Sequence, residues 1–112
     1  MFKHLDERIR VAGQIAPDDV ARAAAEGVVM IINNRPEGES DDQTPGAEIE
    51  AAAQAAGMDY VAIPVSHAGF SEWQVEAMAK ALEQAQGPVL AYCRSGTRST
   101  LLWALAEAGR GA

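Results

Sequence analysis

The chain has 112 residues, of which 48% are hydrophobic. This is the size and composition of a single globular domain, so we expect one hydrophobic core over residues 1–112. Sixteen acidic against nine basic residues give a formal net charge of -7, and no cluster of Lys and Arg offers the surface that nucleic-acid binding needs. No apolar run approaches the ~20 residues that span a bilayer. We therefore expect a cytoplasmic protein with neither nucleic acid nor membrane as a partner.

The sequence contains one cysteine and two histidines. A single cysteine excludes an internal disulfide and is typical of a reducing compartment. His4 and His67 lie far apart and lack the spacing of metal ligands. We therefore expect neither a metal site nor a cofactor. The mixed charged and polar residues at the N-terminus do not have the composition of a signal peptide.

Strand and helix signals alternate in the first half of the chain. After a short strand at 8–11, Pro17 and two aspartates begin a helix that ends at Gly27. The continuous apolar run at 28–32 predicts a strand buried on both faces. The polar segment 33–44 that follows is the longest irregular stretch of the sequence, and such loops are often functional.

The alternation continues in the second half. The expected elements are a helix at 45–56, a strand at 60–63, a helix at 71–86, a strand at 89–92 and a last helix that begins near residue 98. Ser71 and Gln74 form the capping-box pattern that begins the third helix. We expect the last helix to carry Leu101, Leu102 and Leu105 inward.

Strands joined by helices predict an α/β fold, in which a mostly parallel sheet is flanked by helices on both faces. Ligands of such folds bind at the carboxyl ends of the strands. The segments 33–44, 64–70 and 93–98 each follow a predicted strand. We therefore expect these three loops to form the functional site. The sequence ends soon after the last helix, and we expect the natural chain to continue further.

The loop that begins at Cys93 carries the clearest chemical signal. Cys93 follows a buried strand directly, and a helix begins about five residues later. Backbone N–H groups of such a turn form a nest for an anion, and the helix N-terminus and Arg98 add positive charge. This environment lowers a thiol pKa, which makes Cys93 a candidate nucleophile. The residues expected to bind the anion are Arg94, Ser95, Gly96 and Thr97. The alternative is that Cys93 is a small buried hydrophobe before a plain turn.

Charged residues of the segment 33–44 allow two interpretations each. Arg35 either binds a substrate anion beside the cysteine loop or is a surface arginine before a turn proline. The acidic residues either clamp a cation or form a solvated acidic loop, and we favour the solvated loop. These residues are Glu37, Glu39, Asp41 and Asp42.

Four segments resemble a bacterial protein family. They are Gly13-Gln14-Ile15, Ile32-Asn33-Asn34-Arg35-Pro36-Glu37-Gly38-Glu39, Ile63-Pro64-Val65 and Leu90-Ala91-Tyr92-Cys93-Arg94-Ser95-Gly96-Thr97-Arg98-Ser99. Nearly the whole chain is similar to the phosphatase-like domain of beta-lactamase-hydrolase-like proteins, and its last segment resembles cysteine-dependent phosphatases and rhodaneses. The resemblance implies a tyrosine-phosphatase-like fold and either phosphatase or sulfurtransferase activity. In some relatives it implies fusion to a persulfide-oxidising metal enzyme.

The sequence departs from the cysteine-phosphatase pattern at three places. Tyr92 stands where that pattern has histidine. Only four residues separate Cys93 from Arg98, which matches the shorter rhodanese loop. The segment 64–70, where the pattern places an aspartate general acid, contains His67 but no carboxylate. Cleavage of a phosphate ester needs a proton donor to the leaving oxygen, whereas sulfur transfer does not when the leaving group is a stable sulfite or thiolate.

These departures favour a sulfurtransferase, in which Cys93 becomes a persulfide and Arg98 orients the sulfane-sulfur donor. The alternative is a phosphatase that hydrolyses phosphomonoesters through a phosphocysteine, with Ser99 and His67 assisting. A second alternative is a non-catalytic anion-binding or regulatory module. The expected partners are a small anionic substrate (a sulfane-sulfur donor or a phosphoester), a thiol acceptor and, from the resemblance, a persulfide-oxidising metal enzyme.

Overall fold

The computed structural model describes residues 2–110, which form five strands and four helices. In chain order they are β1 (Lys3–His4), β2 (Ile9–Ala12), α1 (Pro17–Ala25), β3 (Met30–Asn33), α2 (Gly46–Ala55), β4 (Asp59–Ala62), α3 (Glu72–Gln84), β5 (Val89–Tyr92) and α4 (Thr97–Arg110). Every predicted element is present, with bounds shifted by one or two residues. The two-residue strand β1 was not predicted, because two residues are too few to show an alternating pattern.

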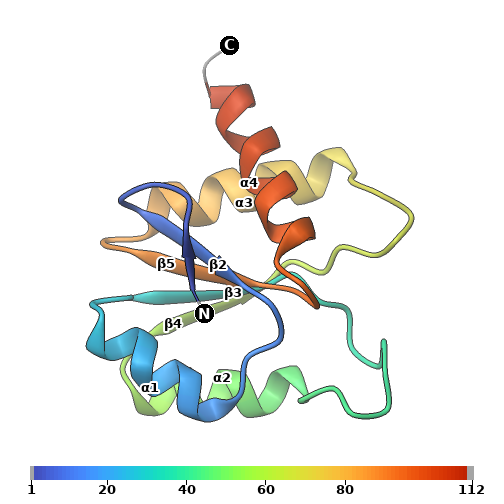
Figure 1. Cartoon of the computed structure of the whole chain (residues 1–112). Helices are drawn as coiled ribbons and strands as arrows, with labels where there is room; N and C mark the ends of the chain where they lie inside the picture. Colours follow the sequence, from blue (N-terminus) through green and yellow to red (C-terminus); the bar gives the residue numbers. More distant parts are fainter. Residues whose placement is uncertain (1, 111–112) are drawn as a thin grey trace.

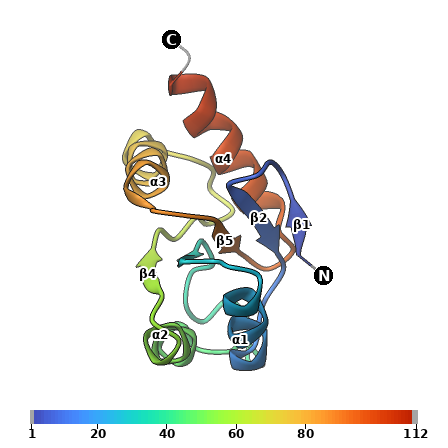
Figure 2. The same cartoon turned by 90° about the vertical axis from the view of Figure 1, so that its left-hand side faces the viewer.

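The strands form one sheet in the order β1-β2-β5-β3-β4. Strand β1 pairs antiparallel with β2, and all other pairs are parallel. Helices α3 and α4 cover one face of the sheet and α1 and α2 cover the other (Figures 1 and 2). The predicted α/β fold with a mostly parallel sheet is therefore confirmed.

The central strands are buried on both faces because helices cover both sides of the sheet. Alternate residues of β5 enter two different cores: Val89 and Ala91 pack toward α3 and α4, whereas Leu90 and Tyr92 pack toward α1 and α2. All four of these side chains are at most 1% exposed. Both cores therefore hold β5 in place, and β5 in turn fixes the start of the loop that follows it.

Local signals in the sequence explain where the helices begin. The Ser71 N–H donates to Gln74 Oε1 at 2.8 Å, which is the reciprocal bond of the predicted capping box. The Ala16 N–H donates in the same way to Asp19 Oδ2 at 2.8 Å at the start of α1. Each side chain satisfies a backbone donor that the first turn of the helix leaves without a partner.

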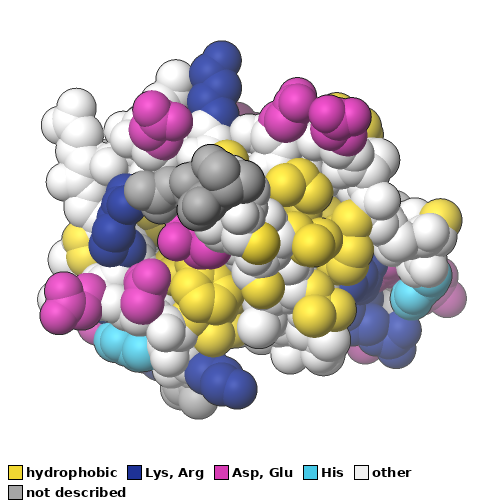
Figure 3. All heavy atoms as spheres, turned by 90° about the horizontal axis from the view of Figure 1, so that it is seen from above, with side chains coloured by type: hydrophobic (Ala, Val, Ile, Leu, Met, Phe, Trp, Pro, Cys, Tyr) yellow, Lys and Arg dark blue, Asp and Glu magenta, His cyan; other side chains and the backbone are white. Residues whose placement is uncertain are grey.

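Helix α4 differs from the prediction in the direction of its leucines. Leu102 is fully buried, but Leu101 is 48% exposed and Leu105 is 43% exposed. One turn of helix separates Leu101 from Leu105, so both lie on one flank of α4, beside the face that carries Leu102. Figure 3 looks down on the layer of α3 and α4 and shows hydrophobic side chains gathered on part of this side of the molecule. None of the helices between residues 2 and 110 has the length and hydropathy that crossing a bilayer requires.

Candidate active site

The loops after β3, β4 and β5 meet at the carboxyl end of the parallel strands, at the right of Figure 1. The Asn34 N–H donates to the Tyr92 carbonyl at 2.8 Å, and the Val65 N–H donates to the Asn34 carbonyl at 2.9 Å. The Arg98 guanidinium donates to the carbonyl of Val65. These bonds join all three loops, as predicted from their positions in the chain.

Cys93 lies at the bottom of its loop, with its side chain fully buried. The Gly96 N–H donates to Cys93 Sγ at 3.0 Å, and Gly96 has φ +92, which favours glycine at this turn. Burial raises the pKa of the Cys93 thiol, but hydrogen bonds from the backbone of Ser99, Ser95 and Gly96 and from the Ser99 side chain together outweigh it. The net pKa lies below its ordinary value, so the loop stabilises a thiolate.

Arg98 presents one edge of its guanidinium to Glu39. Nη1 donates to Glu39 Oε2 at 2.7 Å and Nη2 donates to Glu39 Oε1 at 2.8 Å. This bidentate pair leaves Nε and the second Nη2 hydrogen on the other edge of the fork. The pKa of Arg98 is raised, chiefly by the hydrogen bonds to Glu39 against the effect of burial, and further by the charges of Glu39 and Cys93. Arg98 is thus held between the Glu39 carboxylate and the Cys93 loop.

Arg35 contacts the same carboxylate and is buried inside the protein. Its Nε donates to Glu39 Oε1 at 3.1 Å, its Nη1 to Gln14 Oε1 at 2.9 Å and its Nη2 to Ser40 Oγ at 3.1 Å. The Arg35 side chain is only 4% exposed. Arg35 is therefore not the surface arginine of the second interpretation, because its side chain is buried and its three nitrogens donate to protein groups, and its role in binding a substrate anion stays a prediction.

Glu39 is a largely buried partner of Arg98 that the sequence interpretation placed in a solvated loop. Its side chain is 11% exposed and lies between the guanidinium groups of Arg35 and Arg98. Hydrogen bonds from Arg98, against the effect of burial, and then those from Arg35 lower the pKa of Glu39 from 4.5 to about 2. Glu39 is therefore ionised throughout the physiological range and orients Arg98. The spacing of Arg35 and Glu39 within a segment that carries the family resemblance was the available signal.

Glu37 in the same loop contacts the start of α2 rather than an arginine. Both of its carboxylate oxygens accept from the Gly46 N–H, at 3.0 and 3.2 Å. Gly46 is the first residue of α2, where a negative charge stabilises the positive end of the helix dipole. Glu37, Asp41 and Asp42 are exposed, as expected of a solvated acidic loop, whereas Glu39 is not. Glu37 and Glu39 fix a helix terminus and an arginine.

A cleft with a volume of about 460 Å³ opens over the Cys93 loop. Its lining residues are Ser66, His67, Gly69, Phe70, Arg94, Ser95, Thr97, Arg98 and Leu101. His67 is 82% exposed, and its Nε2 lies 4.0 Å from Glu39 Oε2. The cleft thus brings His67 together with Arg94, Ser95, Thr97 and Arg98 of the loop, whereas Cys93, Gly96 and Arg35 are buried and do not line it.

Ser99 is fully buried beneath the loop rather than in the cleft. Its hydroxyl donates to Asn34 Oδ1 at 2.7 Å, and Asn34 is fully buried as well. Asn34 therefore lies one side chain away from Cys93, a position that sequence reasoning did not assign to it.

The β2–α1 connection supports the Cys93 loop from the side. The Gln14 N–H donates to the Arg94 carbonyl at 3.2 Å, and a Cβ atom at Gly13 would lie 2.9 Å from the same carbonyl oxygen. Only glycine therefore lets the two backbones approach this closely.

Substitution Gly13→Ala is expected to displace the Arg94 carbonyl and lower kcat/KM for the domain's substrate by about 10²-fold, since small displacements of a reacting geometry have effects of that size. Steady-state kinetics would measure this loss. Gly109→Ala is the matched control, because nothing lies within 4 Å of a Cβ at Gly109. Equal kinetics of the two variants would contradict the supporting role of Gly13.

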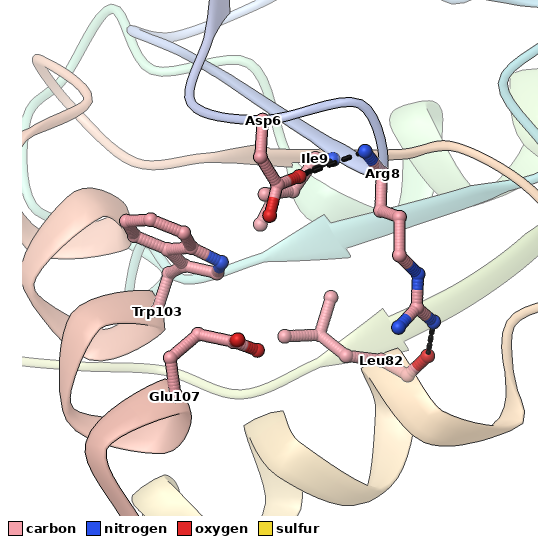
Figure 4. Close-up of a pocket in the computed structure, with 6 residues that line it drawn as sticks. All are labelled: Asp6, Arg8, Ile9, Leu82, Trp103 and Glu107. Carbon is pink, nitrogen blue, oxygen red and sulfur yellow. Dashed lines mark hydrogen bonds between the residues drawn. The ribbon is translucent and has the colours of Figure 1, made fainter. Parts of the chain in front are cut away.

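A second cavity, of about 190 Å³, lies at the opposite end of the strands (Figure 4). The Asp6 carboxylate there accepts from the N–H groups of Arg8 at 2.7 Å and Ile9 at 3.0 Å. The Arg8 guanidinium donates to the Leu82 carbonyl at 2.6 Å. These bonds join the turn before β2 to the end of α3. The cavity is remote from Cys93 and does not belong to the candidate active site.

The fold and the buried cysteine in a loop before a helix define a cysteine-phosphatase-like domain. Residues 1–110 match the family model described as beta-lactamase hydrolase-like protein, phosphatase-like domain, and the chain belongs to this family. A beta-lactamase hydrolase-like protein of Agrobacterium fabrum is 41% identical over 104 residues, which cover 93% of this chain and 24% of the relative. The chain thus spans about a quarter of the length of the curated relatives it matches.

Solved structures agree with this assignment. A proposed phosphatase of Neisseria meningitidis superimposes with a TM-score of 0.87 at 35% identity, covering 98% of this chain and 78% of that one. A kinase-associated phosphatase, with serine in place of its catalytic-site cysteine, has a TM-score of 0.66 at 16% identity and covers 88% of this chain and 66% of its own. At that identity the likeness concerns the fold alone. The predicted family and fold are confirmed, whereas the comparisons give sulfur transfer no support and favour the phosphatase alternative.

Proposed function

We propose that this domain is a cysteine-dependent phosphatase that hydrolyses phosphomonoesters through a phosphocysteine at Cys93. The observation that carries the proposal is the geometry around Sγ. The Gly96 N–H reaches Sγ at 3.0 Å, and Arg98 is held by Glu39 on one edge only. A phosphoryl group above Sγ would find backbone donors of the loop and a guanidinium fork, which stabilise the charge of its equatorial oxygens.

The reaction has two steps. In the first, the Cys93 thiolate attacks phosphorus, an S–P bond forms, and the P–O bond to the leaving group breaks while its oxygen takes up a proton. In the second, a water oxygen attacks phosphorus and gives up a proton to solvent or to His67. The S–P bond then breaks, its electron pair returns to Sγ, and inorganic phosphate leaves.

The proton of the first step has no carboxylate donor in the segment 64–70. His67 at the rim of the cleft is the side chain that supplies it, with water as the other donor. Substrates whose leaving oxygen needs little protonation are therefore the best substrates under this proposal.

Substitution His67→Asn is expected to lower kcat/KM for an alkyl phosphate by about 10²-fold while leaving 4-nitrophenyl phosphate almost unaffected, since a phenolate of low pKa leaves without an acid. Kinetics with both substrates measure the difference, and Ser66→Ala serves as a control from the same cleft. An equal loss on both substrates would show that His67 does not act as the general acid.

The proposed function is tested by phosphate release from 4-nitrophenyl phosphate, run beside sulfur transfer from thiosulfate on the same sample. Phosphate release that depends on Cys93 supports the phosphatase. Sulfur transfer without phosphate release would replace it with the second candidate, a sulfurtransferase with a Cys93 persulfide and a thiol acceptor. The observation that favours the second candidate is the four-residue spacing between Cys93 and Arg98. If the sample shows neither activity and its thiol is unreactive near neutral pH, the result would indicate a non-catalytic anion-binding module.

A further inference from the structure

A hollow lined by Lys3, the Lys3 hollow, opens at the surface beside the cleft over the cysteine loop. Its volume is about 280 Å³, and it shares Ser95, Thr97 and Leu101 with the cleft. These three residues are exposed and form a rim between the two spaces. A molecule bound in the cleft can therefore extend across this rim into the hollow.

The two spaces are free of acidic side chains. Among residues 2–110, no aspartate or glutamate lines either of them, although the chain has sixteen acidic residues. Arginine and lysine side chains line both: Arg94 and Arg98 the cleft, and Lys3 the hollow. A concave surface that carries one sign of charge attracts ligands of the opposite sign. The surface on both sides of the rim is therefore suited to anionic groups.

Strand β1 brings Lys3 to this place. Lys3 pairs with Val11 of β2, and the side chains of directly paired residues lie on the same face of a sheet. Val11 packs toward α3 and α4, so the Lys3 side chain lies on that face, at the edge of the sheet (Figure 2). The same hollow is lined by Gly96, whose N–H donates to Cys93 Sγ at 3.0 Å. The hollow therefore extends from the loop of the nucleophile to Lys3.

Two donors of the hollow have no acceptor inside the protein. Lys3 forms no ion pair with any described residue. Ser95 Oγ donates to Thr97 Oγ1 at 3.1 Å. This bond uses the proton of the Ser95 hydroxyl, and no group between residues 2 and 110 accepts that of the Thr97 hydroxyl. An ammonium group and a hydroxyl proton at one hollow match the oxygens of an anion.

We propose that the Lys3 hollow is a subsite for a second anionic group of the substrate. The substrate class is then small phosphomonoesters that carry a further phosphate or a carboxylate. The scissile phosphoryl group lies at Cys93, and the body of the molecule crosses the rim at Leu101. The second anion accepts from the Lys3 ammonium and the Thr97 hydroxyl. Hydrolysis of such a molecule rests on the proposed function, whereas binding of its second anion at Lys3 does not.

The test compares α,ω-alkanediol bisphosphates with the ω-hydroxyalkyl phosphates of the same chain lengths, from two to six carbons. The kcat/KM of each bisphosphate is divided by two for its two equivalent phosphates and then by that of its partner. This ratio should reach about 10 at one chain length, since hydrogen bonds to charged groups contribute on that order. It should fall for shorter and longer chains, because two fixed sites match one span. The ω-carboxyalkyl phosphates, run in parallel, distinguish a phosphate subsite from a general anion subsite.

Substitution Lys3→Gln should bring the ratio down to about 2 or less, and added salt should lower it in the parent, because exposed charges are screened. Lys80→Gln is the matched control. Lys80 is the other lysine of the chain, is exposed on α3 and lines neither space, so its loss should leave the ratio at the parent value.

Three results would overturn the inference. They are a ratio near one in the parent at every chain length, equal effects of Lys3→Gln and Lys80→Gln, and a ratio that is lost in Arg94→Gln but retained in Lys3→Gln. The last result would place the second anion in the cleft, where Arg94 lies.

Calorimetric binding to Cys93→Ser separates this inference from the proposed function, because it needs no turnover. Suppose that the parent hydrolyses no compound of the series, but Cys93→Ser binds the bisphosphate more tightly than its partner and loses this preference when Lys3 is also replaced by glutamine. The proposed function then fails and the subsite stands. Equal rates of hydrolysis for both compounds of every pair, with equal affinities, would contradict the subsite and leave the proposed function standing.

Discussion

Replacing Cys93 with serine is expected to lower phosphomonoester hydrolysis by on the order of 10⁴-fold or more, to the background rate. A serine hydroxyl in the same place keeps the hydrogen bonds of the loop but is hardly ionised near neutral pH, and nucleophile substitutions in other enzymes have effects of this size. Cys93 is fully buried and accepts from the Gly96 N–H, so serine fits without a cavity. Phosphate release from 4-nitrophenyl phosphate measures the loss.

Binding of inorganic phosphate distinguishes loss of the nucleophile from loss of the anion-binding loop. The serine variant should still bind phosphate, since the backbone donors and Arg98 are retained, and its thermal unfolding should resemble that of the parent. Arg94→Ala is a useful comparison because Arg94 is exposed at the rim. Retention of more than about a hundredth of the parent rate in Cys93→Ser would argue against covalent catalysis.

The second large effect is expected from Glu39→Gln, with a loss of about 10²–10³-fold in kcat/KM. Glutamine is the same size as glutamate but has no charge, so the bidentate pair with Arg98 is lost and the guanidinium can leave its position above Cys93. Because Arg98 is expected to contact the transferred phosphoryl group, kcat should fall at least as much as KM rises.

Glu37→Gln is the matched control, since it is the same change two residues away in the same loop. Glu37 bonds the first N–H of α2 and not Arg98, so this variant should lower the melting temperature slightly and leave kcat/KM near the parent value. Similar kinetic losses in both variants would mean that the loop acts as a whole rather than through the Glu39–Arg98 pair.

The Glu39 pair also predicts a dependence of stability on pH. The pKa of Glu39 is about 2 in the folded protein, below its ordinary value of 4.5. Its stabilising contribution is therefore complete above about pH 5 and is lost as the pH falls toward 2. The difference in unfolding free energy between the parent and Glu39→Gln should shrink over that range, which denaturant titrations at several pH values can measure.

Most of the fold could be predicted because its signals are local. Buried runs such as Val89–Tyr92, the Ser71 and Gln74 cap and the glycine at 27 mark elements without knowledge of the rest of the chain. The alternation of strands and helices then fixes which loops share an edge of the sheet. The Cys93 loop could be recognised for the same reason, since its nucleophile, glycine and arginine lie within six consecutive residues.

Features that depend on contacts distant in sequence could not be predicted. In the sequence, Glu39 is one of several acidic residues in a polar loop. Only the fold brings it into contact with Arg98, which lies 59 positions further along the chain. Asn34 meets Ser99 across 65 positions. Leu101 and Leu105 follow the apolar spacing of a buried face, but α3 covers only the side of α4 that carries Leu102. The preference for phosphorus over sulfur chemistry rests on the family and fold comparisons rather than on the loop length.

The central claim is that Cys93 carries the phosphoryl group during turnover. The most direct measurement is acid quenching of the domain within milliseconds of mixing with 4-nitrophenyl phosphate, followed by mass spectrometry of the peptide that contains Cys93. The proposed mechanism predicts one added phosphoryl group on Cys93, absent in Cys93→Ser. Turnover of the substrate with no modified cysteine at any quench time, or a sulfur atom on Cys93 after exposure to thiosulfate with no phosphoryl adduct, would contradict it.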